Sequence, residues 1–366
     1  MEKAKVYFTT FRTSLQENLQ QKLMRLMLTA GMDRIDFENK YVAIKMHFGE
    51  PGNLAYLRPN YARTVADLVK QLGGHPFLTD CNTLYVGGRK NALDHLESAY
   101  QNGFNPYNTG CHILIADGLK GTDDVEVPVD GEYVKNAKIG RALMDADIII
   151  SLTHFKGHEA AGFGGTIKNL GMGCGSRAGK MEMHSQGKPV VYEDKCIGCG
   201  SCVRACAHGA PHVINKKMHI DLDKCVGCGR CIGVCPMDAI DAANDEITTI
   251  LNCKMAEYSK ALVQGRPNFH ISLVCDVGPL CDCYGVNQMP VIPDVGMFAS
   301  FDPVALDLAC AEACNKMPKN PDVDFEFEEK GEDLFHSLHT VTDWRAQIRH
   351  GVKIGLGTDQ YELIKI

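Results

Sequence analysis

Eight of the 17 cysteines fall into two runs with the same internal spacing. The first run is Cys196, Cys199, Cys202 and Cys206, and the second is Cys225, Cys228, Cys231 and Cys235. Each cysteine of the second run lies 29 residues after its counterpart in the first. Thiolates are the ligands of iron–sulfur clusters, and this spacing is typical of ferredoxins that hold two [4Fe–4S] clusters. The sequence therefore predicts two such clusters between residues 190 and 243.

The fourth cysteine of each run is expected to bind the cluster of the other run. One cluster would take Cys196, Cys199, Cys202 and Cys235, and the other would take Cys225, Cys228, Cys231 and Cys206. A pair of zinc sites is the alternative, because CxxC pairs also bind zinc. Zinc needs four ligands per site, however, and a pair of zinc sites would not explain the third step in the cysteine spacing of each run.

A second group of candidate ligands lies outside these runs. Cys281 and Cys283 flank Asp282, and in a strand both thiols would share one face while the carboxylate took the other. We expect the two thiols, with His154, to hold a metal, a third cluster or a redox couple, and packing as ordinary buried thiols is the alternative. Cys174 and His184 are further candidate ligands. A flavin is the other cofactor that this place could take.

Residues able to do chemistry also follow several predicted strands. They are Lys45, His47, Asp80, Cys81, Asp117, His154, Lys156, His158 and Cys275. Ligands of open parallel sheets bind beyond the carboxyl ends of the strands, so we expect a site there. Taken singly, each of these side chains is more simply a packed or solvated residue. If the protein is an enzyme, Lys156 and His158 are its predicted catalytic residues.

Residues 162–180 contain seven glycines. Lys168, Arg177 and Lys180 lie among them, and we predict that these cations bind an anionic cofactor whose charge the backbone amides also cradle. The segment matches neither the phosphate-binding P-loop nor a dinucleotide-binding loop that follows a strand. The alternative is a connector that packs against the clusters.

Outside the segments described above, predicted strands alternate with predicted helices along the chain. We expect strands at residues 4–8, 41–47, 76–79, 111–116, 147–152, 269–274 and 361–366. We expect helices at residues 14–30, 61–72, 91–100, 137–145, 303–315 and 343–350, the first with a capping box of Ser14 and Glu17. This order predicts an α/β fold with a mostly parallel sheet flanked by helices. We expect residues 1–189 and 244–366 to build one α/β domain, with 190–243 as an inserted ferredoxin module.

Composition narrows the function. The 366 residues carry 38 Lys and Arg against 45 Asp and Glu, and no basic run is present, which argues against nucleic acid and against anionic membranes as partners. No apolar segment approaches the length of a membrane span. We therefore expect a cytoplasmic protein, in which clustered cysteines more often bind metal than form disulfides.

Several motifs together resemble one family. They are found at residues 154–158 (HFKGH), 164–174 (GGTIKNLGMGC), 176–180 (SRAGK), 281–283 (CDC), 293–296 (PDVG), 302–307 (DPVALD) and 355–357 (GLG). In this order, on both sides of the cysteine runs, they resemble domain of unknown function family 362. The resemblance implies an iron–sulfur protein of anaerobic bacteria or archaea, and it implies no settled substrate.

We interpret the chain as an electron-transfer component of a low-potential oxidoreductase that carries two [4Fe–4S] clusters and meets a redox partner protein. Self-association and enzymatic activity are left open. One alternative is a non-catalytic ferredoxin-like binding module that docks a separate reductase. Another is a metallocentre assembly factor, in which Cys281 and Cys283 hold a metal in transit.

Overall fold

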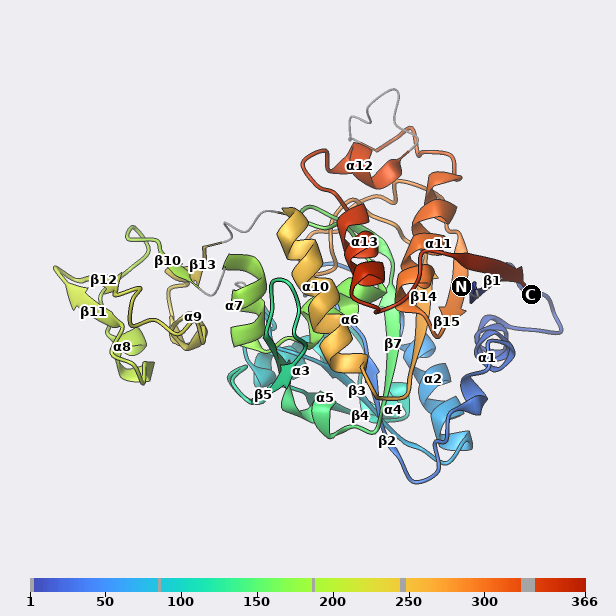
Figure 1. Ribbon diagram of the computed structural model, residues 1–366, viewed down its shortest axis with the longest axis horizontal. Coiled ribbons are helices and arrows are strands. Elements are labelled where there is room, and N and C mark those ends of the chain that lie inside the picture. The colour runs from blue at the N-terminus through green and yellow to red at the C-terminus, as the bar shows by residue number, and fades with distance from the viewer. Residues whose placement is uncertain (1–2, 85–86, 186–187, 244–247, 324–332) are drawn as a thin grey trace.

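The computed structural model describes residues 3–84, 87–185, 188–243, 248–323 and 333–366. At its centre is an eight-stranded sheet with the order β16-β1-β15-β14-β7-β2-β3-β4 (Figure 1). These strands are β1 (Ala4–Thr9), β2 (Tyr41–Lys45), β3 (His75–Asp80), β4 (His112–Ile115), β7 (Ile148–His154), β14 (Asn268–Val274), β15 (Gly296–Ser300) and β16 (Tyr361–Lys365). β15 is antiparallel to both neighbours, and all other pairs are parallel. The fold is therefore mixed α/β with a large, mostly parallel sheet.

Helices cover both faces of this sheet, and each face has its own apolar core. One face carries α1 (Leu19–Thr29), α2 (Pro59–Gln71), α3 (Ala92–Gln101) and α4 (Pro106–Thr109). The other carries α6 (Thr166–Cys174), α10 (Thr248–Val263), α11 (Pro303–Asn315), α12 (Leu334–Leu338) and α13 (Arg345–Lys353). Every residue of β7 is buried, as expected for a strand that is covered on both sides.

Residues 189–242 form a smaller lobe that projects from this body beside α7 (Arg177–Ser185), as Figure 1 shows. Its elements are β10 (Pro189–Val191), α8 (Ser201–Ala205), β11 (Pro211–Ile214), β12 (Lys217–Ile220), α9 (Arg230–Val234) and β13 (Ile240–Ala242). β10 pairs with β13 and β11 with β12. Met218, Ile232 and Ile240 contribute to a small apolar core of the lobe. Because β10 and β13 pair, the two ends of the lobe meet at its base.

The first predicted helix begins later than the sequence suggested. The residue that caps α1 is Asn18, whose side chain accepts a hydrogen bond from the Gln21 amide while the Gln21 side chain accepts one from the Asn18 amide. Ser14 Oγ instead accepts from the amides of residues 16 and 17 in a separate turn, and Leu15 is fully exposed. The prediction of a helix from residue 14 was therefore wrong, because two capping boxes compete and the second precedes the buried stripe.

The helix predicted at residues 137–145 begins later than expected, because residues 137–140 belong to a strand. β5 (Asp124–Pro128) and β6 (Asn136–Gly140) form an antiparallel hairpin, and only α5 (Arg141–Asp145) is helical. Ala137 and Ile139 alternate with exposed or half-buried residues and point into the core. This alternation with a period of two is typical of a strand.

The glycine-rich segment is folded into a short hairpin and two helices. β8 (Lys156–His158) pairs with β9 (Gly162–Gly164), and α6 and α7 follow. A side chain at Gly171 would collide with the backbone carbonyl of Met255 on α10, so glycine permits the close approach of these helices. The segment is thus not an extended connector.

Elsewhere the predicted elements agree well with the structure. α11 spans the predicted residues 303–315, and Asp302 caps it by accepting hydrogen bonds from Val304 N and Ala305 N. β16 forms at the predicted residues and lies at an edge of the sheet. α10 and β15 were not predicted. α10 has buried residues around most of its circumference and so lacks the polar face that marks an amphipathic helix.

The buried carboxylate of Glu257 on α10 joins three parts of the body. It accepts hydrogen bonds from the backbone amides of residues 132–134 and lies 2.8 Å from Nε2 of His350 on α13. Glu257→Ala leaves these donors buried without an acceptor, and we expect a loss of about 3 kcal/mol in the free energy of unfolding. Urea denaturation measures it, with exposed Glu97→Ala as the control. Equal stability of the two variants would contradict this role.

Candidate metal and ligand site

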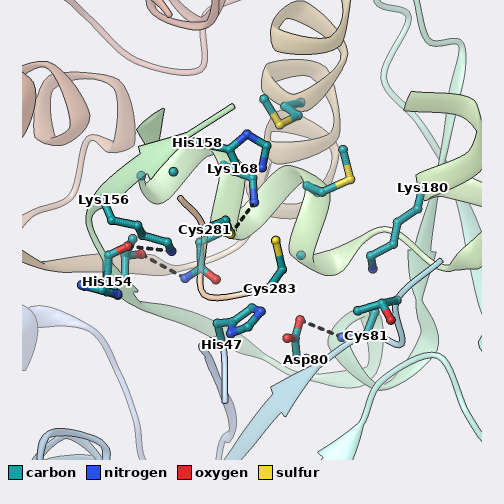
Figure 2. Close-up of a pocket in the computed structure, with 18 of the residues that line it drawn as sticks. His47, Asp80, Cys81, His154, Lys156, His158, Lys168, Lys180, Cys281 and Cys283 are labelled. Atoms are coloured by element: carbon teal, nitrogen blue, oxygen red, sulfur yellow. Dashed lines mark hydrogen bonds between the residues drawn. The ribbon is translucent and has the colours of Figure 1, made fainter. Parts of the chain in front are cut away.

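A cavity opens at the carboxyl ends of the parallel strands (Figure 2). Lys45 ends β2, Asp80 ends β3 and His154 ends β7, so the sheet itself brings the three side chains together. The functional side chains that line the cavity are Lys45, His47, Asp80, Cys81, Arg89, His154, Lys156, His158, Lys168, Asn169, Lys180, His184, Cys281 and Cys283. Most of the strand-end residues predicted from the sequence therefore do share one site.

Lys45 and Asp80 form a buried ion pair at the floor of this cavity. Lys45 Nζ lies 3.0 Å from Asp80 Oδ1 and donates to Asn169 Oδ1 at 2.8 Å. Burial raises the pKa of the Asp80 carboxyl, but the nearby charges of Lys45 and His95 outweigh it and lower the pKa overall. Asp80 is therefore a carboxylate that neutralises a lysine, and Asn169 ties Lys45 to α6.

His154 is held in a different network. Its Nδ1 lies 2.8 Å from Asp282 Oδ2, and its Nε2 lies 2.7 Å from the backbone carbonyl of Cys275. A carboxylate and a carbonyl can only accept, so both ring nitrogens donate and the ring carries both protons. Such an imidazolium has no lone pair for a metal. The predicted role of His154 as a metal ligand does not fit this geometry.

Asp282 is the buried partner of two cations. Lys156 Nζ lies 3.4 Å from Asp282 Oδ2 and also donates to the backbone carbonyl of His154. Burial raises the pKa of Asp282, but His154 and Lys156 outweigh it and bring the pKa to about 2. Lys156, predicted as catalytic, is therefore paired within the cavity wall, while its side chain still lines the cavity.

The thiols on either side of Asp282 lie next to His158. One ligand atom from each of Cys281, Cys283 and His158 lies within 4.8 Å of the others. A hydrogen bond from Cys283 lowers the pKa of Cys281 well below its usual value, and Lys168, whose Nζ lies 3.5 Å from Cys281 Sγ, contributes to this effect. Burial and the charge of Lys168 lower the pKa of His158, which is therefore neutral. Cys281 and Cys283 lie at a turn, and His158 lies in the short hairpin of β8 and β9.

Two further candidate cysteines lie apart from this group. Cys81 Sγ donates to the backbone carbonyl of Cys174, and both residues are buried. Burial raises the pKa of the Cys174 thiol to about 12, so it stays protonated. His184 lines the cavity but is not part of the ligand group that the described residues form. Asp117 accepts from Asn82, and burial raises its pKa to about 6.

Of the three cations predicted to bind a cofactor, Lys168 and Lys180 line the cavity and Arg177 does not. Arg177 is fully buried between the body and the lobe. Its Nε and Nη2 donate to the backbone carbonyls of Lys120 and Lys90, and its guanidinium packs where a side chain at Gly233 would lie. Nη1 is buried and has no hydrogen-bond partner among the described residues. Arg177 therefore faces the lobe.

In the lobe the eight cysteines of the two runs line two small cavities. Cys206 lies with Cys225, Cys228 and Cys231 around one cavity. Cys235 lies with Cys196, Cys199 and Cys202 around the other. Each cavity thus has the first three cysteines of one run and the last of the other.

Sequence reasoning missed three residues that shape the central cavity. Arg89 Nε donates to Glu50 at 2.6 Å, its Nη1 lies 2.8 Å from His47 Nε2, and its Nη2 donates to the carbonyl of Cys283. Asn169 bridges Lys45 and Thr153. Glu50 and Arg89 lie in loops without a motif, so no signal marked them. Asn169 belongs to the family-like motif at residues 164–174, which could have marked it.

The fold and the site define an α/β protein with soft candidate ligands at the edge of its sheet and a cysteine-rich lobe beside them. The chain belongs to the family described as domain of unknown function (DUF362), whose model matches residues 42–312, as the resemblance predicted. Among the described residues no helix combines the length and apolar character needed to cross a bilayer.

The chain is also weakly similar, in sequence or in structure, to several known proteins. A thylakoid-associated protein from Synechocystis sp. is 27% identical over 124 residues, which are 34% of this chain and 35% of that protein. The chain thus matches about a third of the length of that curated relative. The lactate racemase apoprotein from Thermoanaerobacterium thermosaccharolyticum has a TM-score of 0.36 at 10% identity, over 75% of this chain and 51% of the other. A protein from Thermotoga maritima has a TM-score of 0.39 at 11% identity, over 81% and 57%. These scores support no argument about activity.

After the hydrogen bond from Cys283, the charge of Lys168 is a further cause of the lowered pKa of Cys281. Lys168→Met removes the ammonium next to Cys281 Sγ, and we expect the pKa of that thiol to rise, which moves the pH profile of its alkylation by iodoacetamide to higher pH and slows the reaction most on the acid side of that profile. Peptide mass spectrometry after timed anaerobic labelling measures the rate. Lys180→Met removes a lysine of the same cavity that donates to Gly175, and it should leave the rate unchanged. Equal slowing in both variants would contradict a specific role of Lys168.

Proposed function

We propose that this chain is an electron-transfer protein that carries two [4Fe–4S] clusters and exchanges electrons with a ligand in the central cavity. The grouping of the eight cysteines carries the proposal. Two sets of four thiols, each drawn from both runs, are the donor sets that two cubane clusters need, and soft thiolates suit iron. Bound there, the clusters supply one-electron transfer, and the chain supplies their position and surroundings.

The backbone around the cysteines supports this proposal. Gly200 and Gly229, 29 residues apart, have φ of 72° and 64° and precede α8 and α9. This left-handed conformation suits glycine and makes the same sharp turn in both halves of the lobe. The repeat in sequence is therefore also a repeat in conformation, as expected if each half wraps a similar inorganic core.

One of the two sets lies close to the central cavity. Met181 on α7 lines the cavity of Cys206, Cys225, Cys228 and Cys231, while Lys180 and His184 of the same helix line the central one. Leu84, which also lines the central cavity, packs in one apolar cluster with Met181. A single helix with its side chains, roughly 10–12 Å across, therefore separates the two places. We assign this set to the cluster that exchanges electrons with the cavity.

The cavity has the charges to bind an anion. Lys168 lines it together with Lys45 and Lys180, and Lys156 borders it from β8. In this proposal Lys156 and Lys168 stabilise the negative charge of the ligand, and His158, while its ring binds no metal, exchanges a proton with it. Lys180 contributes a further positive charge on the α7 side. Whether a reaction takes place there distinguishes an oxidoreductase from a non-catalytic module that docks a separate reductase.

The lobe also offers a surface for a redox partner protein. Ile197 and Val226 are equivalent positions of the repeat, each next to the first cysteine of its run, and both are more than half exposed. Exposed apolar side chains next to a redox centre are suited to brief docking of another protein. We propose that the partner contacts the lobe there.

Iron and sulfide analysis tests the two clusters. After anaerobic reconstitution we expect about eight iron and eight acid-labile sulfide per chain. Two double variants test the exchange of fourth ligands. Cys196→Ala with Cys235→Ala should leave one set complete and retain about four iron, whereas Cys196→Ala with Cys206→Ala should damage both sets and retain almost none. The reverse order would mean that each run binds its own cluster. Zinc without sulfide would exclude the clusters.

Arg177 provides a test of the cluster that borders α7. Its buried Nη1 has no partner among the described residues, and its guanidinium lies near Cys228 and Cys231, so it is placed to donate a hydrogen bond to sulfur. Arg177→Lys should lower the reduction potential of that cluster by roughly 60 mV, the equivalent of one hydrogen bond to a charged group at about 1.4 kcal/mol.

Potentiometric titration monitored by EPR measures this shift in the Cys196→Ala, Cys235→Ala background, where one set of ligands is complete. Arg230→Lys is the matched control, because Arg230 is exposed on α9. An unchanged potential in Arg177→Lys, with iron content retained, would exclude a contact between Arg177 and the cluster.

A further inference from the structure

We propose that Cys281, Cys283 and His158 bind one thiophilic divalent metal ion, such as Zn²⁺ or Co²⁺, at a site separate from the eight cysteines of the lobe. One ligand atom of each residue lies within 4.8 Å of the other two. In a tetrahedral zinc site the ligand atoms lie roughly 3.4–3.8 Å apart, so small side-chain movements complete the geometry. The inference does not depend on the two clusters.

The donor set selects the class of metal. Two thiols and one imidazole favour zinc, cobalt or nickel over magnesium and calcium, which prefer oxygen ligands. Three protein ligands are one fewer than a structural zinc site uses. The remaining position would face the central cavity, which all three residues line. An anionic ligand of the cavity could therefore bind the metal directly, with Lys156 close by.

The turn that carries the thiols is already fixed. Asp282 between them is bonded to His154 and Lys156, and its backbone carbonyl accepts a hydrogen bond from Glu50 N at 3.0 Å. Arg89 donates to the backbone carbonyl of Cys283. A site that is held in place before the metal arrives loses little entropy on binding.

The orientation of His158 is fixed as well. Its Nδ1 accepts hydrogen bonds from the amides of Ala160 and Ala161, both at 3.1 Å, which leaves Nε2 as the nitrogen for the metal. Because Nδ1 accepts, the neutral ring carries its proton at Nε2. A metal needs the lone pair of Nε2, so binding requires the ring proton to move to Nδ1, where Glu159 Oε2 lies 3.7 Å away and can accept a hydrogen bond. This exchange gives up the two amide hydrogen bonds at Nδ1, and the thiols bind as thiolates.

Lys168 is the residue that a metal must displace. Its ammonium lies 3.5 Å from Cys281 Sγ and competes with a metal for the same sulfur. A dication and an ammonium at this distance repel each other. Removing Lys168 should therefore tighten metal binding, which is the opposite of what loss of a structural residue would do.

Equilibrium dialysis of the anaerobically reconstituted full-length protein against Zn²⁺, with iron and zinc measured on the same sample, tests the site. We expect one zinc per chain beyond the iron of the lobe. Cys281→Ser with Cys283→Ser should weaken zinc binding at least a hundredfold, and His158→Ala at least tenfold, with iron content unchanged. Lys168→Met should bind zinc more tightly, by about tenfold, while Lys180→Met should not differ from the parent.

Cys81→Ser is the matched control for the thiols, because Cys81 lines the same cavity without belonging to the ligand group. It should leave zinc binding unchanged. Retained iron shows that each variant is folded. Absence of zinc from the parent protein, equal zinc in the Cys281→Ser, Cys283→Ser variant, or zinc that enters only as iron leaves would overturn the proposal. Failure of the lobe to bind iron would count against the clusters. The difference in bound zinc between the parent and the Cys281→Ser, Cys283→Ser variant would then test this site, because both proteins have the same lobe cysteines, and circular dichroism would check folding.

Discussion

Much of the central cavity depends on the carboxylate of Asp282. It is buried between two cations, an imidazolium at the end of β7 and a lysine at the start of β8. Each of these charges would be costly to bury alone, and together they stabilise one another. Because Asp282 stands between Cys281 and Cys283, the same ion pairs hold both thiols against the sheet. Charge neutralisation at Asp282 therefore contributes to the placement of the thiols.

The same principle orders the other half of the cavity. Lys45 and Asp80 end adjacent strands and neutralise each other, and Asn169 on α6 binds Lys45 at its side-chain carbonyl and the β7 residue Thr153 at its amide. These bonds fix α6 against the strand ends. Lys168 is the neighbour of Asn169 and thereby reaches Cys281. Charges that end parallel strands thus determine where the helix residues and the thiols of the site lie.

The sequence predicted the strand ends well but not the partners within the site. Lys45, Asp80 and His154 could be predicted to meet, because strands that run parallel end at one edge. The role of His154 could not be predicted. It depends on which atoms lie next to the two ring nitrogens, and only the tertiary structure determines those. Arg177 was grouped with Lys168 and Lys180 because the glycine-rich segment has low helix propensity and α7 was not expected. Arg177 and Lys180 lie on neighbouring faces of α7, and of the two it is Lys180 that lines the cavity. Because the sequence did not predict this helix, it could not predict that the two side chains are separated. The role of the eight lobe cysteines as cluster ligands stays a prediction.

The two halves of the lobe repeat each other, yet among the described residues it is Gly229 and Gly233 of the second half that lie against Arg177. The two halves have the same residue at the equivalent positions Gly200 and Gly229. Four residues further on they differ, because Gly233 of the second half corresponds to Arg204 of the first. A side chain at Gly233 would collide with the guanidinium of Arg177, whereas Arg204 is exposed. The second half can therefore lie against α7, and the first half could not replace it. This difference between the repeats is one reason why the set of Cys206, Cys225, Cys228 and Cys231 lies next to α7.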